Sequence, residues 1–228
     1  MMFLYPLGSG SRWNNNEIRY SLRSLEKYIQ VPFDVTIVGL KPSWLTNVQH
    51  IPFVEMPGDN ALVNQAKKLW VAMHYVPNQF IWMNDDFYVL APLAEIPMFH
   101  GGPMLERVDR IKENKHWKLS MYDSAYVHTV ETLTGELCAP NPIHYDQHLP
   151  MPMEKGHIHT LLDRFDLGTF RFRSLYGNFF QVGGILTRDP KAPIPSHGTA
   201  FYSTRNAVPP VTAQFLQAAL PNPSRFEA

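Results

Sequence analysis

The chain has 228 residues, of which 45% are hydrophobic, and its 20 basic side chains balance its 20 acidic ones. This composition supplies a packed core and excludes disordered and fibrous classes, and the length fits one domain. A formal net charge of zero lends no support to a nucleic-acid partner, although it is compatible with a local basic cleft. The single Cys138 excludes an internal disulfide and a zinc site built from several thiolates, which suits a reducing cytoplasm.

The first half of the chain alternates between strand-like and helix-like patterns. The apolar pattern of residues 2–6 predicts a strand. This apolar start is too short to span a membrane and no basic segment precedes it. No other stretch approaches the length that a membrane span requires. In residues 16–29 the apolar positions recur every three or four residues, which predicts a helix capped by Asn15 or Asn16. Further strands are predicted at 33–40, 50–56 and 79–90, and a further helix at 60–76. This order indicates an α/β sandwich with a largely parallel sheet.

The second half gives weaker patterns. Residues 96–102 predict an edge strand, and residues 124–133 and 153–165 predict helices. The Pro-rich last forty residues predict mostly irregular structure.

Two adjacent carboxylates interrupt the strand-like stretch FIWMNDDFYVLAP at residues 80–92. Buried carboxylates cost several kcal/mol unless something pairs with them. A turn that points both side chains into water would avoid that cost. Alternatively, Asp85 and Asp86 bind a hard cation, because Mg²⁺ and Mn²⁺ prefer carboxylate oxygens and keep positions open for phosphate.

Basic and histidine residues in three other segments are candidates for binding an anion. The loop GSGSRWNNN carries Arg12 and precedes the helix with Arg19 and Arg23; it fits an anion site, or an ordinary surface loop beside a solvated helix face. In the histidine-rich segment 144–159, His148 lies in a loop next to prolines and is a candidate general base or metal ligand, whereas His157 and His159 are expected to be bystanders. Arg171 and Arg173 alternate, which on a strand makes a positive patch, either functional or decorative.

Taken together, five segments resemble the Stealth family of sugar-phosphate transferases, which includes bacterial capsule polymerases and the animal N-acetylglucosamine-1-phosphotransferase catalytic subunit. In chain order they are Glu17–Tyr28 (EIRYSLRSLEKY), Lys41–Leu45 (KPSWL), Phe80–Asp86 (FIWMNDD), His148–Pro150 (HLP) and Arg171–Ser174 (RFRS). The order and rough spacing agree over about residues 12–178. The family's acidic opening strand is represented here by MFLYPLGSGS, which contains no acid, and the chain is shorter than typical members.

The resemblance implies a single catalytic domain with a nucleotide-diphospho-sugar transferase fold, like that of the A-type glycosyltransferases. Residues 1–100 would form the nucleotide-sugar-binding half, residues 101–190 the acceptor half, and residues 191–228 an irregular tail. By analogy, Mg²⁺ or Mn²⁺ would bind the donor diphosphate. The implied roles are metal binding for Asp85 and Asp86, contact with the donor for Asn84 and for Arg12, Arg19, Arg23 and Arg171, and catalysis for Asp86, His148 and Arg173.

Three functions remain open at this point. The expected function is transfer of a sugar or a sugar-1-phosphate from a nucleotide sugar to a saccharide or another hydroxyl-bearing acceptor. A second is a glycosyltransferase that decorates a polymer such as hydroxymethylated phage-type DNA. A third, of another class, is a non-catalytic carbohydrate-binding protein, which the aromatic content of 13% would suit.

Overall fold

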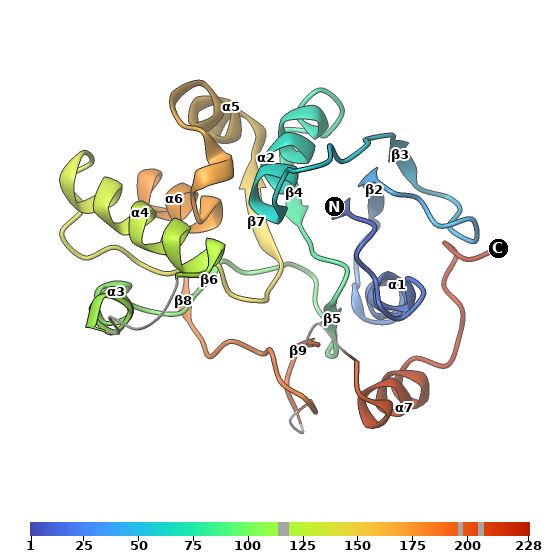
Figure 1. The fold of residues 1–228 in the computed structure, drawn as a ribbon. Coiled ribbons are helices and arrows are strands. Elements are labelled where there is room, and N and C mark those ends of the chain that lie inside the picture. Colours follow the sequence, from blue (N-terminus) through green and yellow to red (C-terminus); the bar gives the residue numbers. More distant parts are fainter. Residues whose placement is uncertain (114–118, 196–197, 205–207) are drawn as a thin grey trace.

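The computed structural model describes residues 1–113, 119–195, 198–204 and 208–228. Figure 1 shows the arrangement of the elements in space. The strands are β1 (Met2–Leu7), β2 (Asp34–Gly39), β3 (Gln49–Ile51), β4 (Gln79–Trp82), β5 (Phe87–Val89), β6 (Phe99–His100), β7 (Met151–Glu154), β8 (Ile185–Leu186) and β9 (Phe201–Ser203). The helices are α1 (Asn16–Tyr28), α2 (Ala61–Ala72), α3 (Leu105–Glu113), α4 (Met121–Gly135), α5 (Lys155–Arg164), the short 3-10 helix η1 (Leu167–Thr169), α6 (Phe172–Phe179) and α7 (Pro210–Ala219).

The main sheet has five strands in the order β3-β2-β1-β4-β7. The first four are parallel to their neighbours, and β7 joins β4 in the antiparallel direction. The predicted α/β architecture with a mostly parallel sheet is therefore confirmed. Two small two-stranded sheets, β5-β9 and β6-β8, lie outside the main sheet.

The central strand β1 is covered on both faces, which explains its continuous apolar sequence. Phe3, Tyr5 and Leu7 pack with the apolar side of α1, in a cluster that includes Leu22. Leu4 points to the opposite face and packs in a second cluster with Leu69 of α2 and other residues. Helices α1 and α2 therefore cover opposite faces of the sheet, as expected when side chains alternate along a strand.

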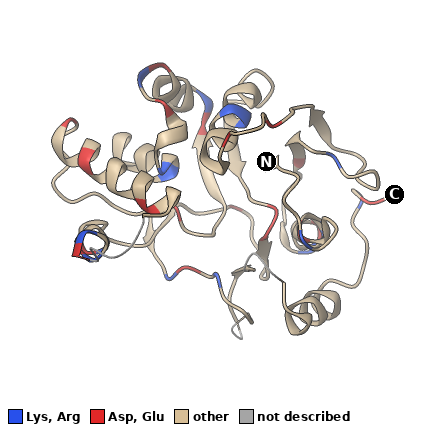
Figure 2. Cartoon of the chain, in the orientation of Figure 1, with Lys and Arg blue, Asp and Glu red and all other residues tan. Residues whose placement is uncertain are grey.

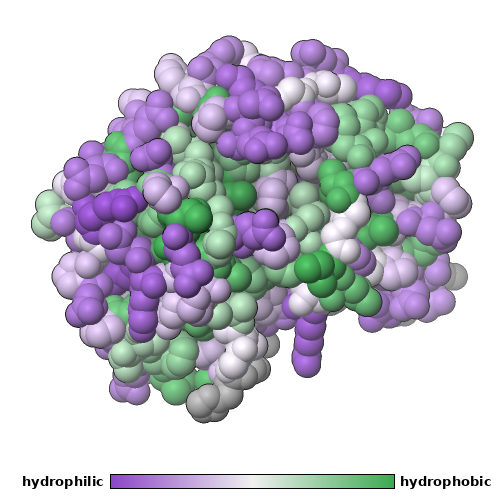
Figure 3. All heavy atoms as spheres, turned by 180° about the vertical axis from the view of Figure 1, so that it is seen from behind, coloured by the Kyte–Doolittle hydropathy of each residue, from purple (hydrophilic) through white to green (hydrophobic). Residues whose placement is uncertain are grey.

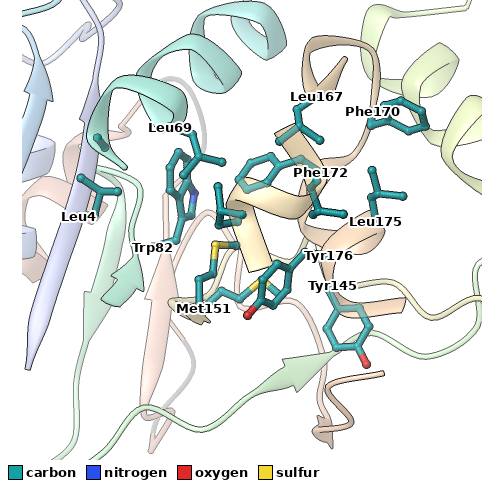
Figure 4. Packing of buried hydrophobic residues seen from close by; sticks show 14 of the residues in the cluster. Leu4, Leu69, Trp82, Tyr145, Met151, Leu167, Phe170, Phe172, Leu175 and Tyr176 are labelled. Atoms are coloured by element: carbon teal, nitrogen blue, oxygen red, sulfur yellow. The ribbon is translucent and has the colours of Figure 1, made fainter. Parts of the chain in front are cut away.

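The larger hydrophobic cluster connects the first half of the chain to the second (Figure 4). Trp82 at the end of β4 is fully buried, and its ring lies 5.0 Å from the ring of Phe172, edge to face. Leu175 and Tyr176 of α6 belong to the same cluster as Leu4 and Leu69. Because one core includes both segments, the loops after β4 and the start of α6 are held in a fixed relation.

The single strand predicted at 79–90 is wrong, because the chain turns after Trp82. The backbone N–H of Phe87 donates to the carbonyl of Asn84 at 3.2 Å, which closes a turn over Asp85 and Asp86. Beyond it, β5 leaves the main sheet and pairs with β9 instead. Burying two unpaired carboxylates within a strand is unfavourable, and the turn instead places Asp85 and Asp86 just after the end of β4.

Several other predictions also need correction. Residues 153–154 belong to β7, so the predicted helix at 153–165 begins only at Lys155. Arg173 lies in helix α6 and Arg171 caps it, rather than alternating on a strand. The segment predicted as an irregular tail contains β9 and α7. The strand predicted at 50–56 is limited to Gln49–Ile51.

The outer surface mixes polar and apolar side chains, as the view from behind shows (Figure 3). Within the described ranges, no helix combines the length and apolar character needed to cross a bilayer.

The C-terminal residues are fixed against α1. Glu227 accepts two hydrogen bonds of 2.7 Å from the guanidinium of Arg23, whose side chain is 13% exposed against 10% for Glu227. Glu227 also accepts from the backbone N–H of Ser224, and Phe226 is buried beside it. These contacts attach the end of the chain to the first helix.

Substituting Glu227→Gln should lower the free energy of unfolding by about 2–4 kcal/mol, because it leaves a largely buried guanidinium without its counter-charge. Urea unfolding at pH 7 measures this. The matched control is Glu131→Gln, which removes an ion pair to Lys112 whose two side chains are 57% and 55% exposed. That change should cost less than about 0.5 kcal/mol. Equal effects of the two substitutions would contradict the structural role of the Arg23–Glu227 pair.

Candidate active site

The strand order creates a crevice between β1 and β4. From β1, the chain continues to β2 and β3 on one side of the sheet, whereas β4 lies on the other side. In open α/β sheets, ligands bind where the strand order reverses, outside the carboxyl ends of the strands. The loop that follows β1 and the 84–86 turn that follows β4 both lie there, and a cavity of about 670 Å³ opens between them.

Most of the sequence-predicted site residues line this one cavity. They are Arg12, Asn84, Asp85, Asp86, His148, Arg171 and Arg173. Arg19 and Arg23, predicted to bind the donor, are not among its lining residues. Arg23 is bound to Glu227, and the Arg19 guanidinium lies 4.4 Å from the centre of the Trp44 ring and 3.4 Å from the Glu227 carboxylate. These two arginines stabilise the attachment of the C-terminal segment, and we do not assign them to the site.

The side of the cavity formed by α1 and the 84–86 turn is acidic. Figure 2 shows acidic residues on the connection between β4 and β5. Burial, together with the neighbouring Asp86 and Glu17, raises the pKa of Asp85 to about 7. Glu17 lies in the first turn of α1, is 6% exposed, and accepts a 2.7 Å hydrogen bond from Ser11. Within the described part of the chain, no ion pair neutralises Asp85 or Asp86.

Asp86 is less isolated than Asp85. Burial raises the pKa of Asp86, and a 2.9 Å hydrogen bond from Ser203 on β9, with the nearby side chains of Lys191 and His148, offsets this only in part. Both carboxylates are thus held in an environment that disfavours their charge. Perturbed carboxylates in a cleft are typical of a functional site.

Basic residues also line the cavity, and Asp146 holds two of them in place. Asp146 is 6% exposed and accepts hydrogen bonds from the backbone and hydroxyl of Ser174 at 3.0 and 2.6 Å. Its other oxygen lies 3.8 Å from Nε of Arg171 and 3.5 Å from Nε of Arg173. Burial alone would raise the pKa of Asp146, but these arginines outweigh it and hold the pKa at about 2. One anchored carboxylate therefore holds two guanidinium groups beside the cavity.

His148 is held from both of its ring nitrogens. Nδ1 lies 2.9 Å from Oδ2 of Asp189, and Nε2 lies 3.1 Å from Nζ of Lys191. Burial alone would raise the pKa of Asp189, but the hydrogen bond from His148 lowers it, so the ionised carboxylate accepts a hydrogen bond from Nδ1–H. An ammonium group only donates, so Nε2 carries the lone pair. The two contacts specify the tautomer in which Nε2 is able to take a proton.

The donor set fits a divalent cation that also binds phosphate. Asp85 and Asp86 offer carboxylate oxygens, the ligands that Mg²⁺ and Mn²⁺ prefer, and their charge is not compensated by an ion pair. Among the described residues, no group of three or more acidic, histidine or cysteine side chains forms a complete metal cage. Asp85 and Asp86 are the residues that could hold such a cation, and phosphate oxygens and water would have to supply its remaining ligands.

The structure adds site residues that the sequence reasoning did not select. They are Gly8, Gly10, Ser11, Glu17, Arg107, Tyr122, His144, Asp146, Asp189 and Lys191. His144 and Asp146 lie in the histidine-rich segment 144–159, and Glu17 is the first residue of the segment Glu17–Tyr28 that resembles the Stealth family. These three residues could therefore have been selected from the sequence. Asp189 and Lys191 had no signal in the sequence, because tertiary folding alone brings residues 187–192 to His148.

No protein-family model matches this chain, and no curated protein matches its sequence.

His144 gives a pH-dependent test of the cavity wall. Burial lowers the pKa of His144 to about 4, and the cations Arg171, Arg173 and Arg107 contribute to this shift. Between pH 6.5 and 4 the unfolded chain protonates this histidine while the folded chain does not, so acidification in this window destabilises the fold. Asp85 acts in the opposite direction, because its folded pKa is raised.

The free energy of unfolding of the wild type, taken relative to that of His144→Gln, should therefore fall by about 2–3 kcal/mol between pH 7 and pH 4. The contribution of Asp85 cancels in this difference, since both proteins contain it. Urea unfolding at several pH values measures the effect. His159→Gln, which changes an exposed histidine of α5, serves as the control and should stay within about 0.5 kcal/mol of wild type throughout. A pH-independent difference for His144→Gln would contradict the placement of His144.

Proposed function

We propose that the protein is a metal-dependent transferase that moves a sugar or a sugar-1-phosphate from a nucleotide-diphospho-sugar to an acceptor hydroxyl. The observation that supports this most strongly is that one cavity is lined both by Asp85 and Asp86, which form no ion pair among the described residues, and by two arginines that Asp146 holds in place. Its position at the strand-order reversal suits a nucleotide. The resemblance to the Stealth family agrees with the proposal, and we propose that the mostly parallel α/β sheet belongs to an A-type glycosyltransferase fold.

In this proposal, Asp85 and Asp86 hold Mg²⁺ or Mn²⁺, which supplies charge neutralisation at the donor diphosphate. Binding the cation would offset the free-energy cost of burying both carboxylates. The protein without the cation is less stable because of this cost, and it binds the cation more tightly for the same reason. Asn84 lies in the same turn and also lines the cavity. Its amide would contact the sugar or fix the orientation of the carboxylates.

The arginines would bind the phosphate that leaves. Arg171 and Arg173 are already oriented by Asp146, so little conformational entropy is lost when they engage an anion. Arg12 is exposed at the rim of the cavity and would contact the outer part of the donor. Preorganised positive charge at a developing negative charge is a large source of catalysis.

His148 would take the proton from the acceptor hydroxyl. The contact with Asp189 leaves the lone pair on Nε2, and Lys191 must release Nε2 before the acceptor binds there. The anionic donor would favour this release, because it offers the ammonium group of Lys191 an alternative partner.

Two reactions fit this apparatus and are distinguished by their products. When the acceptor attacks the β-phosphorus, nucleoside monophosphate leaves; when it attacks the anomeric carbon, nucleoside diphosphate leaves. The Stealth resemblance favours the first. Chromatography of the nucleotide released from the reacting donor identifies which bond is broken.

Asp86→Asn should reduce metal-dependent release of nucleotide by at least about 100-fold, because it removes a metal ligand and a negative charge. The assay uses Mn²⁺ and a panel of uridine, guanosine and cytidine diphosphate sugars. The variant should also lose the increase in melting temperature that Mn²⁺ gives the wild type.

Asp163→Asn, which changes an exposed carboxylate of α5, is the matched control and should behave as wild type in both assays. Full nucleotide release by Asp86→Asn would exclude the metal assignment. A wild type that releases no nucleotide from any donor of the panel would count against the transferase function.

A further inference from the structure

A second cavity, of about 450 Å³, lies against residues 187–192. It shares two lining residues, Asp189 and Lys191, with the candidate active site. The rest of its described lining is largely apolar, and includes Phe99 of β6, Leu149, Pro190, Ala200 and Phe201 of β9. The two cavities are therefore neighbours with a common polar wall.

The shared wall contains both partners of His148. Asp189 binds its Nδ1 and Lys191 contacts its Nε2. Figure 2 shows that basic and acidic residues alternate in this segment, which follows β8. His148 lines only the first cavity, so a hydroxyl group bound at the Asp189–Lys191 end of the second cavity would reach Nε2 once Lys191 has released it.

The lining of the second cavity differs from that of the first. The four arginines of the active-site cavity are absent from it, and among its described residues only Arg188 and Lys191 are basic. The rings of Phe99 and Phe201 lie 5.3 Å apart in an edge-to-face arrangement, and both are half-buried. Aromatic surface with a few polar groups at one end suits a ligand that has one apolar face and several hydroxyls. A sugar ring, with its C–H face and hydroxyl edge, has this chemistry, whereas a nucleoside diphosphate does not.

We infer that the second cavity binds the acceptor, and that the acceptor is a saccharide whose apolar face packs against Phe99 and Phe201. This inference rests on the proposed transferase function. A hydroxyl of the saccharide lies at the Asp189–Lys191 wall and faces His148. Its oxygen forms the new bond to the donor, and its proton passes to Nε2 of His148. The bond from the attacked donor atom to the leaving phosphate oxygen breaks, and its electron pair stays with the leaving nucleotide.

The test measures saccharide binding directly, without donor or metal. A panel of methyl glycosides is screened against the wild type by saturation-transfer NMR, and dissociation constants are obtained by titration. Phe99→Ala removes an aromatic wall, and Ala200→Trp fills the cavity. Ile185→Ala is the matched control, because Ile185 pairs with Phe99 in the β6-β8 sheet, is 55% exposed and does not line the cavity.

At least one glycoside should bind the wild type and Ile185→Ala equally, and should bind Phe99→Ala and Ala200→Trp at least tenfold more weakly. Circular dichroism confirms that each variant is folded, and because the two substitutions act in opposite ways, a folding failure of one leaves the other as the test. If no glycoside binds the wild type, or if binding persists in the folded variants, the inference is wrong.

Nucleotide release separates this inference from the proposed function. With Mn²⁺ and the donor panel, Phe99→Ala should release nucleotide by hydrolysis within twofold of the wild-type rate, while transfer to the bound glycoside falls at least tenfold. If the wild type releases no nucleotide but glycoside binding is lost in Phe99→Ala, the acceptor role is overturned and the saccharide site stands. If nucleotide release is intact and glycoside binding is unaffected by both substitutions, the transferase function stands and the acceptor site is overturned.

Discussion

The arrangement of this cavity depends on one buried carboxylate, Asp146. Arg171 and Arg173 lie close enough to pair with Asp146, whereas neither forms an ion pair with Asp85 or Asp86 among the described residues. Ser174 in turn fixes Asp146 with two hydrogen bonds. Coulomb attraction to Asp146 therefore holds the two guanidinium groups beside the cavity, and under the proposed function they would bind the phosphate of the donor.

Burial of unpaired carboxylates at this site lowers the stability of the folded protein. Burial disfavours the charge on Asp85, and the neighbouring carboxylates of Asp86 and Glu17 add to this effect, which raises the pKa of Asp85 to about 7. Proteins retain such unfavourable groups mainly where function requires them. A divalent cation with a diphosphate satisfies the carboxylates and the arginines at once, and this joint satisfaction is the physical basis of the proposed transferase function.

The second cavity extends this logic to the acceptor. Residues 187–192 separate a charged space from a largely apolar one, and His148 contacts the boundary through Asp189 and Lys191. Under the proposed function, the first cavity would bind the anionic donor and the second the neutral saccharide, and His148 would be the proton acceptor at their boundary.

The sequence by itself determined the α/β class, because apolar periodicity and strand-like runs alternate clearly through residue 82. It also identified Asp85, Asp86, His148, Arg171 and Arg173, whose residue types carry recognisable chemistry. It did not separate these from Arg19 and Arg23, since an arginine on an amphipathic helix has the same local pattern whether it binds a ligand or a distant carboxylate.

Only the tertiary structure decided which groups meet. Three hydrogen bonds join residues that are far apart in the sequence. Arg23 and Glu227 are separated by 204 residues, His148 and Asp189 by 41, and Asp86 and Ser203 by 117. Such contacts follow from the packing of whole elements, and short-range patterns do not encode them. The break after Trp82 is of the same kind, because β5 leaves the sheet to pair with β9, a strand that the local sequence did not reveal.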